Sequence, residues 1–218
     1  VKENMIGIAL TNSVKLMAPY GGYERELGTN PICIAVPGTK TIVYDGATSI
    51  AAYNKIFLAN AENRHIPDNW ALDNKGHSTT NPEDVVVHGG AVRPFGEYKG
   101  YGLAVMVQIL TGILSGGSIV REKNEVKENV DATAYSFMVI DISKFTELEA
   151  FKKTVDIFGE RLKKSLKQDG VKEIYLPGEI EELKYKESEE QGIKIHEDVI
   201  KSLKQTVENL KMKFELDY

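Results

Sequence analysis

Cysteine is almost absent from this sequence. Cys33 is the single cysteine in 218 residues, so the chain can form no internal disulfide. It lies in the apolar run PICIAVP, which favours a small core residue over a reactive thiol. The lack of cysteine pairs fits a reducing, cytoplasmic setting, and the sequence contains no signal peptide and no lipidation motif.

The sequence also lacks an excess of positive charge and a long apolar run. Lys and Arg number 27 against 32 Asp and Glu, which gives a net charge of -5, and no Lys/Arg cluster interrupts this balance. Such a chain is not expected to bind nucleic acid. The apolar segment from Leu103 to Leu114 falls short of the roughly 20 residues that span a bilayer, so no membrane partner is expected either.

Several common catalytic and cofactor motifs are missing. No G-x-G-x-x-G follows a predicted strand, and there is no Walker loop and no G-x-S-x-G elbow. The four histidines are scattered without a metal-ligand spacing: His65, His77, His88 and His196. We therefore predict no metal site. His65 and His88 fall in predicted loops, where a solvated histidine is commoner than an acid–base group.

What the sequence does contain is a glycine turn that opens into an apolar segment. Gly96 to Gly102 carries Lys99, and in the segment after it, up to Gly112, only Gln108 and Thr111 interrupt the apolar residues. This pattern predicts a helix buried on all sides. Free N–H groups and the positive dipole end at its start would suit an anion, with Lys99 beside them. Alternatively, the glycines only allow close packing and Lys99 is solvated; the segment alone leaves both open.

The remaining patterns predict an α/β domain with a mixed sheet. The predicted strands are Met5–Thr11, Ile32–Val36, Thr41–Asp45, Ala134–Ile142 and Glu173–Leu176, with a short extended piece at 193–195. Those at Ile32 and Thr41 should form a hairpin, and Met5–Thr11 should be buried on both faces. The other predicted helices are Ile50–Asn63, Glu147–Gln168, Ile180–Glu190 and Glu197–Phe214. The charged segment 121–131 should be a surface loop or a lid.

Polar residues follow two of these strands. Ser13 ends the first, where a strand would open toward a site, and Asp45 to Ser49 follows the third. Thr48 or Ser49 either contacts a cofactor or simply caps the next helix, and the residues alone favour the cap slightly. The long loop 18–31 has the length of a functional loop.

Several stretches together resemble the malate/L-lactate dehydrogenase family that lacks a Rossmann fold, whose relatives include ureidoglycolate, sulfolactate and diketogulonate enzymes. They are MIGIALTNS, APYGG, LGTNPICIAVPG, YDGATS, IPDNWALD, TTNPED, GEYKGYGLAVMVQILTGILSGG and LPGE. The resemblance implies a three-layer α/β fold with a mixed, largely antiparallel sheet, as one domain over 1–218. It also implies an oxidoreductase that uses NAD or NADP on a small 2-hydroxy or 2-keto acid such as malate or lactate, and a homodimer.

The resemblance also assigns site residues. The expected cofactor contacts are Ser13, Asp45, Ala47, Thr48, Ser49, Tyr98, Lys99, Gly178 and Glu179, and the expected substrate contacts are Thr29 and Asn30. The glycine–lysine turn is therefore interpreted as functional. The family's catalytic histidine, and an arginine for the substrate carboxylate, belong to a portion that precedes the strand beginning here at Met5.

Two hypotheses follow from that departure. The chain is a dehydrogenase whose N-terminal portion is missing or supplied by a second polypeptide, or it is a non-catalytic remnant that keeps the fold, nucleotide binding or dimerisation. Under either hypothesis the chain alone should be inactive, and it should associate through apolar surface that the missing portion would cover. The substrate and the choice between NAD and NADP stay open.

Overall fold

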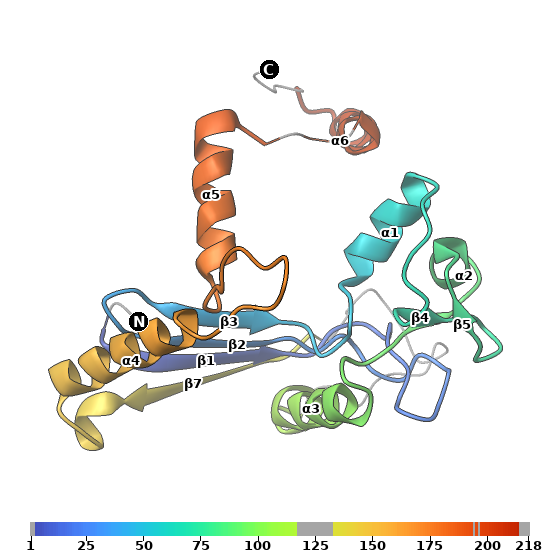
Figure 1. Ribbon diagram of the computed structural model, residues 1–218. Helices are drawn as coiled ribbons and strands as arrows, with labels where there is room; N and C mark the ends of the chain where they lie inside the picture. Colours follow the sequence, from blue (N-terminus) through green and yellow to red (C-terminus); the bar gives the residue numbers. More distant parts are fainter. Residues whose placement is uncertain (1–2, 117–132, 194, 196, 214–218) are drawn as a thin grey trace. The chain divides into compact units, whose positions relative to one another are not determined.

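The computed structural model describes residues 3–116, 133–193, 195 and 197–213, which belong to two compact units (Figure 1). Unit 1 comprises Val1–Gly178 and contains every described strand. Unit 2 comprises Glu179–Tyr218 and contains α5 (Glu179–Gln191) and α6 (Glu197–Asn209). Both helices were expected. The predicted end of the last helix, residue 194 of the extended piece and the charged segment 121–131 lie outside the described residues.

The larger sheet has the order β3-β2-β1-β7, and all its neighbours pair antiparallel. Its strands are β1 (Met5–Thr11), β2 (Ile32–Val36), β3 (Ile42–Gly46) and β7 (Tyr135–Asp141). Four of the five predicted strands, the hairpin of β2 with β3 and the α/β class with antiparallel sheets are confirmed. The prediction that β1 is buried on both faces is wrong: only Leu10 is buried, and the other residues of β1 are half-buried.

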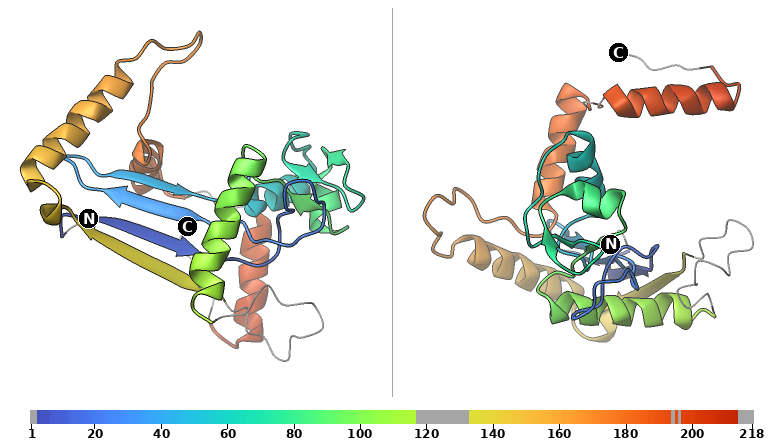
Figure 2. Two further views of the ribbon diagram at one scale, coloured as in Figure 1. Left: turned by 90° about the horizontal axis from the view of Figure 1, so that it is seen from below. Right: turned by 90° about the vertical axis from the view of Figure 1, so that its right-hand side faces the viewer.

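The two long helices of unit 1 lie at opposite ends of this sheet (Figure 2). At the hairpin end, α4 (Leu148–Lys163) is tied to the β2–β3 turn, where Thr39 N–H donates to Asp156 at 3.0 Å. The 3₁₀ turn η2 (Ile142–Lys144) links β7 to α4. The carboxylate of Glu147 caps α4 by accepting from the N–H groups of Ala150 and Glu149, and these bonds, that from Ala150 first, lower the pKa of Glu147. The helix ends five residues before the predicted Gln168.

At the other end of the sheet lies α3 (Tyr98–Gln108), which continues as a π-helical segment, η1 (Ile109–Ile113). The prediction of a helix buried on all sides is wrong, because Leu103, Met106 and Leu114 are 41%, 51% and 73% exposed. One side of α3 packs on β1 and on a small cluster that includes Met17, while nothing among the described residues covers the other side.

The main apolar core lies around a second, smaller sheet. This sheet has the order β5-β4-β6 and consists of β4 (Ala71–Leu72), β5 (Ser78–Thr79) and β6 (Ala91–Val92). Helices α1 (Tyr53–Ala61) and α2 (Pro82–Val86) pack against it. The buried residues that meet here are Ile56, Ala59, Ile66, Ala71, Val85 and Val92. This core fixes β6, and β6 leads directly into the turn before α3.

The predicted strand Glu173–Leu176 is wrong. The segment has no regular structure, and the residue after it, Pro177, accepts a backbone hydrogen bond from β3, from Val43 N–H at 3.0 Å. None of the helices within 3–116, 133–193 and 197–213 combines the length and apolar character that crossing a membrane requires.

Candidate functional site

Asn30 lies at the centre of a group of buried and half-buried polar side chains between the end of β1 and α3. It is fully buried and has a positive φ of 30°. Its Oδ1 accepts from Ser13 N–H at 3.1 Å, and its Nδ2 donates to Ala104 O at 2.9 Å. We call the group formed by Ser13, Thr29, Asn30, Thr48 and Gln108 the polar hub. Asn30 thereby joins the end of the first strand to the middle of α3.

Thr29 connects the hub to the turn after β3. Its N–H donates to Ser13 Oγ at 3.0 Å, and the hydroxyls of Ser13 and Thr29 lie 3.4 Å apart. The carbonyl oxygen of Thr29 accepts twice from Thr48, from the N–H at 2.8 Å and from Oγ1 at 2.9 Å. Predicted cofactor residues and predicted substrate residues are thus hydrogen-bonded to one another.

Two glycines allow the backbone segments of the hub to approach closely. A Cβ atom on Gly28 would lie 2.4 Å from Ser13 Oγ and 2.5 Å from Asn30 Oδ1. A Cβ atom on Gly100 would lie 2.6 Å from Thr48 O and 2.4 Å from Phe95 O, whereas Gly102 faces open space. The close-packing interpretation of the glycine turn therefore holds at Gly100 and does not hold at Gly102.

The first turn of α3 departs from expectation. The N–H groups of Lys99, Gly100 and Tyr101 donate to the carbonyls of Gly96, Phe95 and Glu97. The expectation of free N–H groups for an anion is wrong at these three positions. The reason is the backbone before the helix, where Gly96 and Glu97 both have positive φ and turn the preceding carbonyls toward the helix start.

Lys99 itself stays available for a ligand. Its side chain is exposed, and its ammonium makes no hydrogen bond or ion pair with the described residues. Tyr98 beside it is 61% exposed and packs edge-to-face against Tyr20, with 6.3 Å between the ring centroids. Because Gly100 packs on the Thr48 carbonyl, the first turn of α3 lies beside the polar hub.

Of the predicted residues around the turn after β3, one belongs to the hub and the others lie outside it. Thr48 belongs to the hub, and Ser49 Oγ donates to Ala51 O at 2.8 Å. The alternative that either residue caps the next helix is wrong, since the N-cap of α1 is Ala52 and makes no side-chain cap. Asp45 is exposed on β3 opposite Cys33, whose pKa is raised by burial and then by the charge of Asp45. Ala47 lies between Asp45 and Thr48 in the chain and is half-buried.

Two further predicted residues, Gly178 and Glu179, are the last residue of unit 1 and the first residue of unit 2. Gly178 has φ +94, and a Cβ atom there would lie 3.1 Å from Val43 O on β3. Glu179 is the first residue of α5 in unit 2. The hub therefore gathers Ser13, Thr29, Asn30 and Thr48 of the predicted set. It also contains Gln108, whose only sequence signal is its polarity within an apolar segment.

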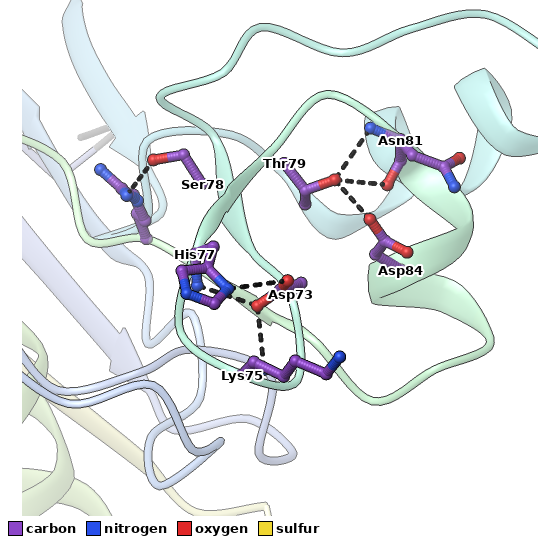
Figure 3. Close-up of polar contacts among 8 residues, drawn as sticks. Asp73, Lys75, His77, Ser78, Thr79, Asn81 and Asp84 are labelled. Atoms are coloured by element: carbon purple, nitrogen blue, oxygen red, sulfur yellow. Dashed lines mark hydrogen bonds and ion pairs between the residues drawn. The ribbon is translucent and has the colours of Figure 1, made fainter.

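A second polar cluster lies on the small sheet (Figure 3). Asp73 accepts from the N–H groups of Lys75 and His77, at 2.9 and 2.8 Å, and the bond from His77 is the main cause of its lowered pKa. Thr79 Oγ1 donates to Asp84, and Arg93 Nη2 donates to Ser78 Oγ at 2.6 Å. These contacts fix the turn between β4 and β5 and the start of α2.

The three described histidines contact residues outside the hub. His65 Nδ1 lies 3.3 Å from Thr80 O, His77 faces Asp73, and His88 faces Glu83. Among the described residues, His, Cys, Asp and Glu side chains nowhere gather in groups of three or more that could hold a metal ion.

Known proteins match this chain over nearly its whole length. The family profile described as malate/L-lactate dehydrogenase matches residues 1–204. The malate dehydrogenase of Pyrococcus horikoshii is 40% identical over 210 residues, covering 93% of this chain and 58% of the relative. The ureidoglycolate dehydrogenase (NAD(+)) of Escherichia coli K12 is 31% identical over 207 residues, covering 93% and 58%.

Solved structures agree with these matches. The malate dehydrogenase structure from Pyrococcus horikoshii has a TM-score of 0.83 and 36% identity, and covers 98% of this chain and 60% of that chain. The structure from Entamoeba histolytica has a TM-score of 0.90 and 25% identity, with coverage of 99% and 64%. The chain thus spans about 60% of the length of these relatives.

Proposed function

We propose that this chain, which belongs to the malate/L-lactate dehydrogenase family, forms the cofactor-binding part of an oxidoreductase that acts on a small 2-hydroxy or 2-keto acid. One observation carries the proposal. Hydride transfer requires cofactor and substrate to touch, and Ser13, the proposed cofactor contact, is hydrogen-bonded to Thr29 and Asn30, the proposed substrate contacts. We place the enzyme in a cytoplasmic setting, which the single cysteine favours.

The cofactor in this proposal is NAD, with NADP as the alternative. The E. coli relative is named as NAD(+)-dependent, which supports NAD. When bound, the nicotinamide would accept or donate the hydride. Lys99 would hold a charged group of the cofactor, with Tyr98, Asp45, Ala47, Thr48 and Ser49 lining its site, and with Gly178 and Glu179 as further contacts. Ser13 and Thr29 would orient the reacting groups through their hydroxyls.

Replacing Lys99 with alanine tests this assignment. The change removes one charge-assisted contact, worth ~1.5–3 kcal/mol, so NADH affinity should fall roughly ten- to a hundredfold. Melting of the cofactor-free protein should hardly change, because Lys99 is exposed and makes no bond with the described residues. Calorimetric titration of NADH and NADPH measures the affinities, with Lys55→Ala, an exposed lysine of α1, as the control. Equal affinities in all three proteins would refute the role of Lys99.

The alternative is a non-catalytic chain that keeps only the fold, nucleotide binding or dimerisation. For the 218 residues by themselves we expect no turnover of malate or lactate, since a general base contributes ~10²–10⁴-fold and the described histidines contact residues outside the hub. An assay of malate and lactate turnover, with the Pyrococcus horikoshii enzyme as positive control, tests this expectation. Activity above the no-enzyme rate would refute this expectation.

We also propose that the chain associates as a homodimer. The support is exposed apolar side chains on two contacting elements of unit 1: Phe137 and Val139 of β7 are 73% and 64% exposed, and Ile113 of η1 is 46% exposed. Exposed apolar surface commonly marks an interaction site when it forms a large patch. Light scattering at micromolar concentration should give about twice the monomer mass of 24.2 kDa. A monodisperse peak at the monomer mass would count against association.

A further inference from the structure

The orientation of the Asn30 amide is fixed by its backbone partners. The N–H group of Ser13 can only donate, so the Asn30 atom that faces it is the oxygen. The carbonyl of Ala104 can only accept, so the atom that faces it is the nitrogen. Both partners demand the same orientation, and the second hydrogen on Asn30 Nδ2 is left to point elsewhere.

Gln108 supplies the acceptor for that second hydrogen. Its Oε1 lies 3.3 Å from Asn30 Nδ2, and only an acceptor is compatible with the fixed Asn30 amide. With Oε1 in this place, Gln108 Nε2 points away from Asn30. There it is buried and has no hydrogen-bond partner among the described residues.

An unpaired buried donor destabilises a fold, and an apolar side chain of similar shape would avoid that cost. Gln108 is only 6% exposed, so bulk solvent does not reach its amide. The side chain is therefore poorly explained by stability alone. What it contributes is the oxygen that completes the hydrogen bonding of Asn30.

Asn30 needs such support because its own backbone is strained. A positive φ is uncommon for residues other than glycine, and Pro31 restricts the preceding residue further toward extended conformations. Such conformations persist where the surroundings over-determine them. The amide contacts with Ser13, Ala104 and Gln108 provide that constraint from three sides.

We propose that Gln108 is a positioning residue of the hub: its Oε1 holds the Asn30 amide, and Asn30 in turn holds the Ser13 N–H group and the turn at Thr29. The proposal rests on the proposed function in one respect, that Ser13 and Thr29 contact the cofactor and the substrate. Gln108 acts through Asn30 and not by touching either ligand.

The experiment compares Gln108→Met, which removes the acceptor, with Gln108→Glu, which keeps an oxygen toward Asn30. Thr111→Val is the matched control, because Thr111 is also buried and polar on the same helix but bonds only within it, to Val107 O at 2.7 Å. Two quantities are measured on the 218-residue chain: hydrogen exchange of the Ser13 backbone amide by NMR, and the dissociation constant of NADH by calorimetry.

Gln108→Met should accelerate Ser13 exchange several-fold and weaken NADH binding roughly three- to tenfold, the effect of losing one ordinary hydrogen bond. At a pH low enough to keep the buried carboxyl protonated, Gln108→Glu should restore both values toward wild type, and Thr111→Val should leave both unchanged. If Gln108→Met does not fold, Gln108→Asn withdraws the oxygen while keeping an amide, and the same changes are expected.

The outcomes separate this inference from the proposed function. A wild-type chain that binds neither NADH nor NADPH refutes the proposed function. In that case, Ser13 exchange that is faster in Gln108→Met, and not in Thr111→Val, would still show that Gln108 holds Asn30 in place. Unchanged Ser13 exchange in Gln108→Met overturns the inference. Equal acceleration in Thr111→Val overturns it as well, because the effect would then be a general loosening of the helix.

Discussion

Gly100→Ala is expected to destabilise unit 1 by about 1–3 kcal/mol, while Gly102→Ala in the same helix turn should be neutral or stabilising. The new Cβ at Gly100 would lie 2.4 Å from Phe95 O, 2.6 Å from Thr48 O and 2.7 Å from Phe95 N. All three are backbone atoms, so no side chain can rotate away to relieve the overlap. Either α3 or the Thr48 turn must shift.

Gly102 supplies the control because it is helical, exposed and has nothing within 4 Å of its ideal Cβ position. Alanine at this position should raise the free energy of unfolding by about 0.5–1 kcal/mol, because it lowers the conformational entropy of the unfolded chain. Urea unfolding followed by circular dichroism measures both variants, and NADH titration shows whether the displaced α3 also weakens binding. Equal unfolding midpoints for the two variants would contradict the close approach of Gly100 to Thr48.

Local patterns predicted the four strands of the larger sheet well, because apolar runs bounded by turn residues depend on nearby sequence alone. The bounds of β1 and β2 match the prediction, and those of β3 and β7 differ from it by one residue at each end. Burial was predicted poorly. The composition of α3 indicates a preference for burial, but it does not record what covers each face, and Met106 remains 51% exposed.

The hub was predictable only in part. Ser13 and Thr48 follow strands, and the family resemblance indicated Thr29 and Asn30. The free N–H groups were predicted wrongly because nothing in the residue type of Glu97 signals its positive φ. Gln108 could be noticed as a polar interruption, but its partner Asn30 is 78 positions away, and that pairing is a property of the tertiary structure.

Asn30→Asp is expected to be the most damaging isosteric change in the hub. It replaces the donating Nδ2 with an oxygen that faces the Ala104 carbonyl and Gln108 Oε1, so two attractive contacts become repulsive. At neutral pH it would also place a charge in a fully buried position. An uncompensated buried charge costs ~3–5 kcal/mol, which is a large share of the stability of a typical domain.

The loss of stability in Asn30→Asp should grow as pH rises. Burial and the neighbouring acceptors raise the pKa of the new carboxyl in the native state above the ~3.9 of an unfolded aspartate. The native form therefore keeps its proton longer than the unfolded form. Relative to wild type, the variant should be most stable below about pH 4 and should lose ~1.4 kcal/mol per pH unit as pH rises toward the native pKa.

Asn12→Asp is the matched control, because Asn12 is nearly as buried, at 7% exposure, but uses its amide oxygen, which accepts from Ala134 N–H at 2.6 Å. A carboxylate keeps that acceptor and binds the N–H group more strongly, which offsets part of its desolvation. Urea unfolding from pH 3 to 8 should therefore give a shallower loss for Asn12→Asp than for Asn30→Asp. Parallel curves would mean that burial alone sets both pKa values, and that the amide nitrogen of Asn30 has no special role as a donor to α3.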